Sequence, residues 1–66
     1  MYKRIKELRE DNNLTQLQVG KAINVTQRTY SYYETGQRMI PVDSLIKLAK
    51  FYGTTVDYIL GLTDKK

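Results

Sequence analysis

Cysteine and histidine are both absent from this 66-residue sequence. Without cysteine the chain has no disulfide, no thiolate nucleophile and no cysteine-ligated zinc, and without histidine it lacks the commonest metal ligand and the commonest general base. Acidic residues remain, but they stand at positions typical of helix surfaces and caps, with no partner for catalysis beside them. The sequence therefore predicts no enzyme, no metal site and no cofactor.

Long hydrophobic runs are also missing. Nothing approaches the roughly 18 apolar residues of a membrane helix, and the first residues, 1–7, lack the apolar stretch that a secretory signal contains. No cysteine is present to carry a palmitoyl or prenyl group, and Tyr2 excludes the N-terminal glycine that myristoylation requires. We expect a cytoplasmic protein with no membrane partner.

Negative charge is scarcer than positive charge. Seven Asp and Glu stand against 11 Lys and Arg, which gives a net charge of +4 and a pI near 9.5. Such a balance favours a polyanionic partner, but a merely soluble basic surface would have the same composition. Charge alone leaves both interpretations open.

Helical periodicity runs through the whole chain. A chain of this length forms one small domain, which we place at residues 1–62, with a frayed tail at 63–66. Apolar residues recur at helical spacing in five segments, about 2–12, 15–24, 26–35, 41–52 and 55–60. No segment shows the sustained alternation of a strand. The predicted fold class is all-α, with the apolar stripes of five short helices converging on one core.

Threonines mark the expected starts of three helices. Thr15 and Gln18 have the spacing of a capping box, in which a hydroxyl and an amide satisfy backbone N–H groups reciprocally. Thr26 and Thr55 stand where further N-caps are expected. Pro41 suits the first turn of the fourth helix, where its missing N–H is no loss.

A tight turn joins the second and third predicted helices. Asparagine is the non-glycine residue that most readily adopts positive φ, so Asn24 predicts a sharp turn, and Gly20 suits the close approach of another backbone. The third helix turns Tyr30 and Tyr33 to one side, which we expect in the core, and polar residues to the other. Two short helices of this kind describe a helix-turn-helix, in which the second helix enters the DNA major groove.

At this point the sequence resembles the phage-repressor, or xenobiotic-response-element, family of helix-turn-helix regulators. The resemblance spans about residues 5–61 and rests on an ordered set of motifs: Leu14-Thr15-Gln16, Val19-Gly20, Ile23-Asn24-Val25-Thr26, Tyr33-Glu34-Thr35-Gly36, Leu45 to Lys50 and Asp57 to Gly61. It implies a compact five-helix, lambda-repressor-like domain that binds double-stranded DNA. The helix from Thr26 to about Thr35 is then the recognition helix.

The resemblance places four side chains of this helix where family members reach base edges: Gln27, Arg28, Ser31 and Tyr32. Their chemistry fits, because Gln can bond bidentately to adenine, Arg to guanine, and a Tyr ring can contact a thymine methyl or offer its hydroxyl to phosphate. For Tyr32 the alternative is that it reflects only a tyrosine-rich composition.

The same resemblance implies contacts with the DNA backbone and one internal ion pair. The backbone contacts are Thr15, Gln16, Thr26, Thr35, Gln37 and Arg38. Thr15 and Thr26 serve as N-caps in any case, and the alternative for Gln16 and Gln37 is a solvated side chain. Arg9 and Glu34 match positions that pair in some family members, and the alternative is two separate surface charges. If buried, the pair would fix the orientation of the two helices more than it would stabilise the fold.

These residues predict a sequence-specific DNA-binding transcriptional regulator, in the manner of a repressor, acting as a symmetric homodimer on a partly palindromic operator. The expected dimer contact is Tyr58, Leu60 and Leu62. The alternative is a protein-interaction module, or antitoxin-like partner binder, that uses Leu17, Met39, Ile40 or the C-terminal helix to hold a regulator protein. For Leu17, Met39 and Ile40, packing over the core is a further alternative.

Overall fold

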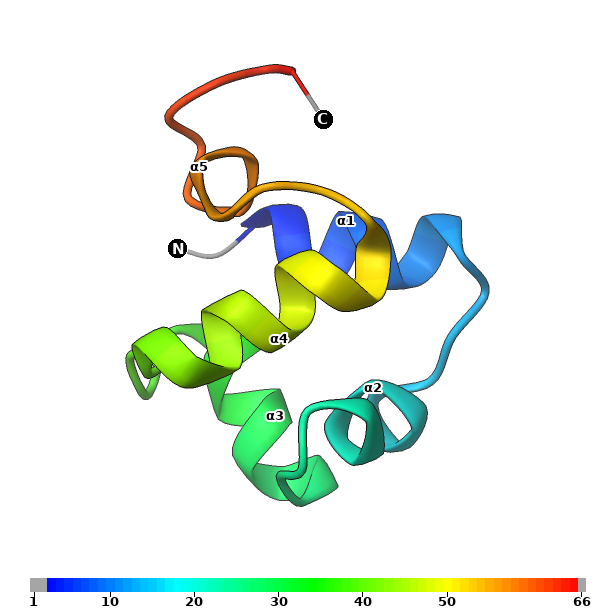
Figure 1. Cartoon of the computed structure of the whole chain (residues 1–66). Helices are drawn as coiled ribbons and strands as arrows, with labels where there is room; N and C mark the ends of the chain where they lie inside the picture. The colour runs from blue at the N-terminus through cyan, green and yellow to red at the C-terminus, as the bar shows by residue number, and fades with distance from the viewer. Residues whose placement is uncertain (1–2, 66) are drawn as a thin grey trace.

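Five helices make up the regular structure of the computed structural model, which describes residues 3–65 (Figure 1). They are α1 (Lys3–Asp11), α2 (Gln16–Ala22), α3 (Gln27–Thr35), α4 (Val42–Tyr52) and α5 (Val56–Ile59). Residues 3–65 contain no strand, and the predicted all-α, five-helix fold is confirmed. Tyr2, the expected start of the first helix, and Lys66, the last residue of the expected frayed tail, lie outside the described residues.

Threonine caps begin three of the helices, as predicted. The Thr15 hydroxyl accepts a hydrogen bond of 3.1 Å from the Gln18 backbone N–H, and the Gln18 side chain accepts one of 2.8 Å from the Thr15 N–H, which completes the capping box. Thr26 and Thr55 accept comparable bonds at the starts of α3 and α5. These bonds satisfy N–H groups that a helix cannot satisfy internally.

Four helix boundaries differ from the prediction by one or two residues, and two of these are the ends of the first and fifth helices, which stop one residue early at Asp11 and Ile59. The second helix ends at Ala22 rather than near Asn24, because Ile23 already has a non-helical backbone (φ −108°, ψ 12°). The fourth helix begins at Val42, because Pro41 has an extended ψ of 152° and is the N-cap rather than a first-turn residue. The carbonyl of Pro41 still accepts the first helical hydrogen bond, from Leu45.

The turn between α2 and α3 depends on two residues with special backbone properties. Asn24 has the predicted positive φ, 62°. The Val25 N–H then bonds to the Gly20 carbonyl at 2.8 Å, which brings the turn back over the second helix. A Cβ atom at Gly20 would lie 3.0 Å from the Val25 carbonyl oxygen and 3.3 Å from that of Thr26. Glycine at position 20 therefore permits the close packing of the turn on α2.

Replacement of Gly20 by valine is expected to lower the free energy of unfolding by about 2 kcal/mol, since overpacking a tight contact costs roughly 1–3 kcal/mol. The measurement is urea unfolding followed by circular dichroism. Ala22→Val is the matched control, because Ala22 is an exposed residue of the same helix. The substitution introduces the same β-branched side chain without the clash. Equal losses in the two variants would contradict the packing argument.

The core is formed by side chains from all five helices and from the loop before α4. Its buried members are Ile5, Leu8, Val19, Ile23, Tyr30, Tyr33, Ile40, Leu45, Leu48, Ala49 and Ile59. The expected core tyrosines Tyr30 and Tyr33 are thus confirmed. The prediction that the apolar stripes converge on the core is wrong at their margins, because Val42 and Ile46 of α4 and Leu60, the C-cap of α5, are exposed.

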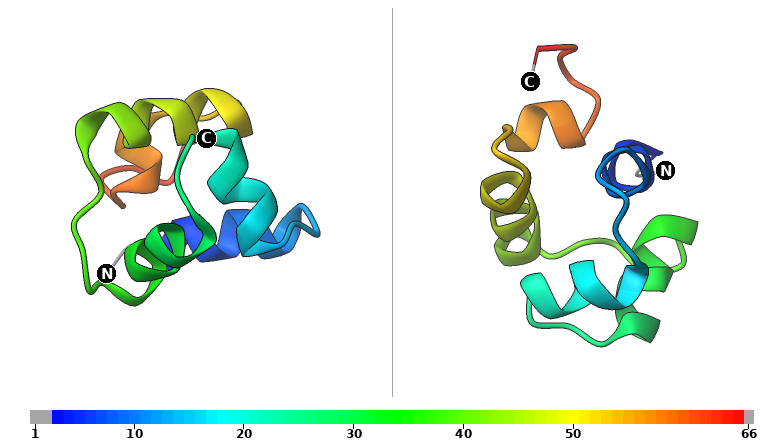
Figure 2. Two further views of the ribbon diagram at one scale, coloured as in Figure 1. Left: turned by 90° about the horizontal axis from the view of Figure 1, so that it is seen from below. Right: turned by 90° about the vertical axis from the view of Figure 1, so that its right-hand side faces the viewer.

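The helices divide the molecule into two ends. In Figure 1 and in the right-hand view of Figure 2, α2 and α3 lie side by side at one end, and α5 lies toward the other end. The fifth helix packs against α4 and α1. Among the described residues no helix has the length and apolar character needed to cross a membrane; the longest, α4, has 11 residues.

Candidate nucleic-acid interface

The third helix separates its side chains into a buried and an outward set. Tyr30 is 0% and Tyr33 5% exposed, so they anchor the helix to the core. On the other side, Gln27 and Arg28 are exposed, and Ser31 and Tyr32 are half-buried. We call these four outward residues the recognition face. Because the anchoring tyrosines belong to the same nine-residue helix, the recognition face is presented from a fixed support.

The recognition face forms one wall of a shallow pocket of about 350 Å³. Its lining residues are Gln16, Gln27, Arg28, Ser31 and Tyr32. The structure therefore brings together the four predicted base-contact residues and Gln16, which comes from the start of the second helix. All five side chains carry hydrogen-bonding groups, which suits an interface with polar base edges and phosphates.

Tyr32 lies between two arginines at the edge of this face. Arg28 Nε donates a hydrogen bond of 2.8 Å to the Tyr32 hydroxyl, and the Arg28 guanidinium carbon is 5.8 Å from the ring centroid. The Arg38 guanidinium carbon is 5.3 Å from the same centroid. The ring thus gathers two cations beside the pocket, where a polyanion would meet them.

Behind the recognition face, Glu34 is held by two other helices. Arg9 of α1 donates from Nε at 2.7 Å and from Nη2 at 3.2 Å, and Gln16 of α2 donates from Nε2 at 3.1 Å. The remaining Arg9 amino group bonds to the carbonyl of Leu14 at 3.0 Å. The side chains of Arg9 and Glu34 are only 15% and 4% exposed. The predicted ion pair is confirmed, and Gln16 braces the recognition helix.

This bonding changes the titration of the groups around Glu34. Burial acts to raise the pKa of the Glu34 carboxyl, but hydrogen bonds from Arg9 and Gln16 outweigh burial and lower the pKa below its ordinary value. Burial and the neighbouring Glu34 raise the pKa of Tyr30, and burial raises the pKa of Tyr52 to about 12. At neutral pH Glu34 is therefore ionised, and both tyrosines are neutral.

The predicted backbone-contact residues flank the recognition face. Thr15 and Thr26 are exposed caps at the starts of the second and third helices, and Thr35, Gln37 and Arg38 are exposed at and beyond the end of the third. The Thr35 hydroxyl donates to the Tyr32 carbonyl at 3.3 Å. These residues surround the recognition face, and their contact with DNA stays a prediction.

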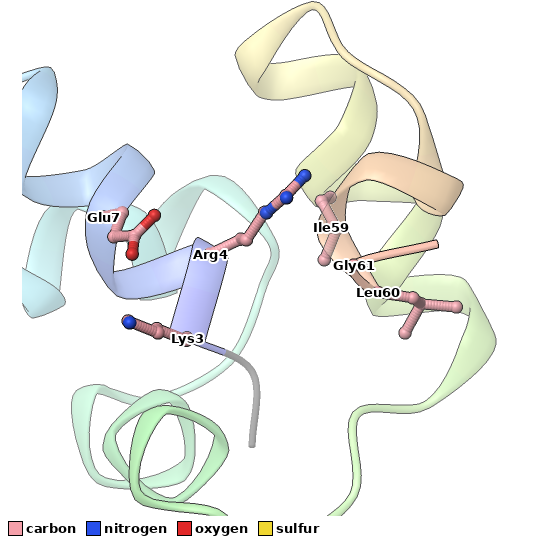
Figure 3. Close-up of a pocket in the computed structure, with 6 residues that line it drawn as sticks. All are labelled: Lys3, Arg4, Glu7, Ile59, Leu60 and Gly61. Atoms are coloured by element: carbon pink, nitrogen blue, oxygen red, sulfur yellow. The ribbon is translucent and has the colours of Figure 1, made fainter. Parts of the chain in front are cut away.

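The expected dimer residues lie at the opposite end of the molecule. Leu60 and Leu62 are exposed, whereas Tyr58 is half-buried under Arg4, whose guanidinium carbon is 4.2 Å from the ring centroid. A second pocket, of about 290 Å³, opens here between α1 and α5 (Figure 3). Its lining residues are Lys3, Arg4, Glu7, Ile59, Leu60 and Gly61. A dimer through this end is compatible with exposure of the leucines and stays a prediction.

Sequence reasoning missed the part that Arg4 plays. Arg4 donates to the carbonyls of Tyr58 and Thr63, at 3.2 and 2.6 Å, and forms an ion pair of 2.5 Å with Asp64. Residues 63 and 64, expected in a frayed tail, thus have specific partners. The contacts join residues more than 50 positions apart, so no local pattern could have indicated them. The Arg28–Tyr32 bond was also missed, although its i, i+4 spacing on a helix is a usable signal.

Comparisons with known proteins agree with this geometry. A family model described as helix-turn-helix matches residues 5–59. The chain is 42% identical over 65 residues to the uncharacterized HTH-type transcriptional regulator YobD of Bacillus subtilis, and the match covers 97% of this chain and 58% of that protein. It is 38% identical over 53 residues to the cryptic phage CTXphi transcriptional repressor RstR of Vibrio cholerae, over 80% of this chain and 48% of that protein.

A solved structure has the same fold. The crystal structure of a transcriptional regulator from Listeria innocua superposes with a TM-score of 0.88 at 25% identity, over 98% of this chain and 61% of that chain. The predicted helix-turn-helix fold is therefore confirmed. The chain spans about half the length of the curated relatives that it matches.

Proposed function

The chain belongs to the helix-turn-helix family, and from that premise we propose that it binds double-stranded DNA sequence-specifically and acts as a transcriptional repressor. The observation that carries the proposal is the recognition face, whose four polar side chains line one pocket and stand on a helix anchored by buried tyrosines. The names of the relatives support regulation, and RstR is named a repressor.

In this proposal the third helix enters the major groove. Gln27 and Arg28 contact base edges, where Gln matches adenine and Arg matches guanine, and Ser31 and Tyr32 complete the contact surface. The backbone contacts of Thr15, Gln16, Thr26, Thr35, Gln37 and Arg38 position the domain without reading sequence. Gln16 can serve there and as a brace, because its bond to Glu34 uses one of its two amide hydrogens.

A symmetric homodimer completes the proposal. A helix of nine residues is about 13 Å long and spans only a few base pairs, so two copies about 34 Å apart supply a usable site length. The proposed contact is the end of the chain with Tyr58, Leu60 and Leu62, which lies away from the recognition face. We place the protein in the cytoplasm, the compartment that holds the DNA of bacteria such as those of the matched relatives.

The alternative function, a protein-interaction module, has less support from the geometry. Ile40 is buried in the core and offers no docking surface, while Leu17 and Met39 are exposed, Met39 at 83%. These two side chains still permit a regulator protein as a partner. A test of DNA binding separates the two functions.

The test first selects bound duplexes from a random-sequence library. It then measures the affinity of the protein for the enriched duplex at salt concentrations from about 50 to about 300 mM. We expect enrichment of a two-fold symmetric site. We also expect log affinity to fall linearly with log salt, with a slope of about −0.9 for each phosphate contact. A library without enrichment, or an affinity insensitive to salt, would favour the interaction module.

A further inference from the structure

The hydrogen bond between Arg28 and Tyr32 determines which edge of the arginine guanidinium is free to contact DNA. A guanidinium has two edges that can each donate a pair of parallel hydrogen bonds, one through Nε and an amino group, the other through Nη1 and Nη2. In this structure Nε already donates to the Tyr32 hydroxyl at 2.8 Å. Only the Nη1–Nη2 edge remains free for a bidentate contact.

From this geometry we infer that Tyr32 is a positioning residue that turns the Nη1–Nη2 edge of Arg28 toward the base pairs and thereby makes Arg28 selective for guanine. The inference rests on the proposed function and names a specificity determinant of the same face. Guanine offers two acceptors, N7 and O6, to two parallel donors. Adenine offers N7 beside a donor amino group, which two donors cannot match.

Several contacts keep Tyr32 in place to do this. Its ring is half-buried, and Arg38 packs within 5.3 Å of its centroid from beyond the end of the helix. The i, i+4 spacing of Arg28 and Tyr32 brings the two side chains onto one face of the third helix. A free arginine side chain has many rotamers, and the conformational entropy that it loses on binding reduces affinity. An arginine that Tyr32 already holds loses less conformational entropy when it binds.

Arg28 also has no competing acid. Within residues 3–65 the ion pairs are Arg4 with Asp64 and Arg9 with Glu34, and Arg28 takes part in neither. Without the Tyr32 hydroxyl, the guanidinium would be free to adopt rotamers in which its paired donors do not face a base edge. Loss of the hydroxyl should therefore reduce the preference for one base while leaving general affinity for DNA intact.

The experiment compares wild-type protein with Tyr32→Phe, Arg28→Ala and Arg38→Ala on the selected duplex and on duplexes in which each guanine is changed in turn to adenine. For wild-type protein we expect one guanine change to weaken binding by about tenfold. For Arg38→Ala, which removes one neighbour of the Tyr32 ring but keeps the bond between Arg28 and the Tyr32 hydroxyl, the same change should still weaken binding by more than about fivefold. For Tyr32→Phe and Arg28→Ala we expect that same change to weaken binding by less than about twofold. Tyr32→Phe should keep the wild-type salt slope, and Arg38→Ala should lose about one phosphate contact from it.

Each outcome of this comparison either supports or contradicts the role of Tyr32. If Tyr32→Phe keeps the full guanine preference, or if no guanine preference depends on Arg28, the inference is wrong while the proposed function stands. If wild-type protein binds no duplex, the proposed function fails and the inference fails with it. A loss of preference shared by Tyr32→Phe and Arg28→Ala, with the salt slope of Tyr32→Phe unchanged, supports the inference.

A second measurement uses the free protein. The Nε–H resonance of Arg28 in a ¹H–¹⁵N spectrum should move on Tyr32→Phe, since the acceptor of its hydrogen bond is removed, while the Nε–H resonance of Arg9 stays in place. An unchanged Arg28 resonance would contradict the hydrogen bond itself. Because phenylalanine retains the ring, the variant should fold as the parent does, which circular dichroism checks.

Discussion

Arg28→Ala is expected to weaken binding to the selected duplex by about 5- to 150-fold for each half-site, because a good bidentate base contact is worth roughly 1–3 kcal/mol. Gln27→Ala should have an effect of the same size, and the double variant should bind the selected duplex little better than a random one. Fluorescence anisotropy with a labelled duplex measures these affinities. The large expected effect follows from the position of both side chains, which are exposed on an anchored helix and border the same pocket.

Lys50→Ala is the matched control for charge. It removes one positive charge from an exposed position in the last turn of α4, away from the recognition face. Its affinity for the selected duplex should stay within about twofold of wild type, since a distant exposed charge is largely screened. Should Gln27→Ala and Arg28→Ala behave like Lys50→Ala, the third helix would not be the element that reads the sequence.

Arg9→Met is expected to lower the free energy of unfolding by about 3 kcal/mol. The substitution removes the partner of a carboxylate that is only 4% exposed, and an uncompensated buried charge costs roughly 3–5 kcal/mol. For a domain of this size such a loss lowers the midpoint of thermal unfolding by roughly 12–24 °C. Circular dichroism measures the midpoint. Glu7→Gln, an exposed residue of the same helix, should shift it by only a few degrees.

The double variant Arg9→Met, Glu34→Leu tests whether the instability of Arg9→Met comes from the unpaired charge of Glu34 or from lost packing. With both charges removed, the buried carboxylate no longer lacks a partner, so much of the stability should return. The double variant should nevertheless bind DNA less well, because α3 loses the hydrogen bonds that Glu34 accepts from α1 and α2. A double variant as unstable as Arg9→Met alone would contradict this account of the ion pair.

Acid titration gives an independent check. The pKa of Glu34 is lower in the folded chain than its ordinary value of 4.5, so the unfolded chain binds the proton more tightly. The contribution of Glu34 to stability is therefore complete above about pH 4.5 and is lost as the pH falls through the lower, folded value. Glu34→Gln should show a smaller loss of stability over this acid range than wild-type protein.

Local chemistry made much of the fold predictable. The capping box at Thr15 and Gln18 and the left-handed Asn24 depend on residues within four positions of one another, so the sequence alone indicates them. The buried sides of Tyr30 and Tyr33 follow from helical periodicity. Residues at the margin of a stripe were less predictable. Val42 and Ile46 are apolar yet exposed, because the position of α4 on its neighbours decides which of its flanks faces solvent.

The candidate site was predictable only as a set of residues. Family resemblance indicated the recognition face and the Arg9–Glu34 pair, and the structure brings both together as expected. The way the residues combine depends on side-chain geometry instead. No pattern indicates that Arg38 packs on the Tyr32 ring, or that Arg4 reaches Thr63 and Asp64, because these contacts depend on how loops and chain ends return to the helices.

The placement of α5 at the end of the molecule away from α2 and α3 has a practical consequence (Figure 1). A fluorophore or a short affinity tag joined after residue 65 would extend from the end that carries α5, where the proposed dimer contact also lies, and leave the surface of Arg28 and Gln27 open. Immobilised or labelled forms of the domain can thus report on duplex capture without steric interference at the surface being measured.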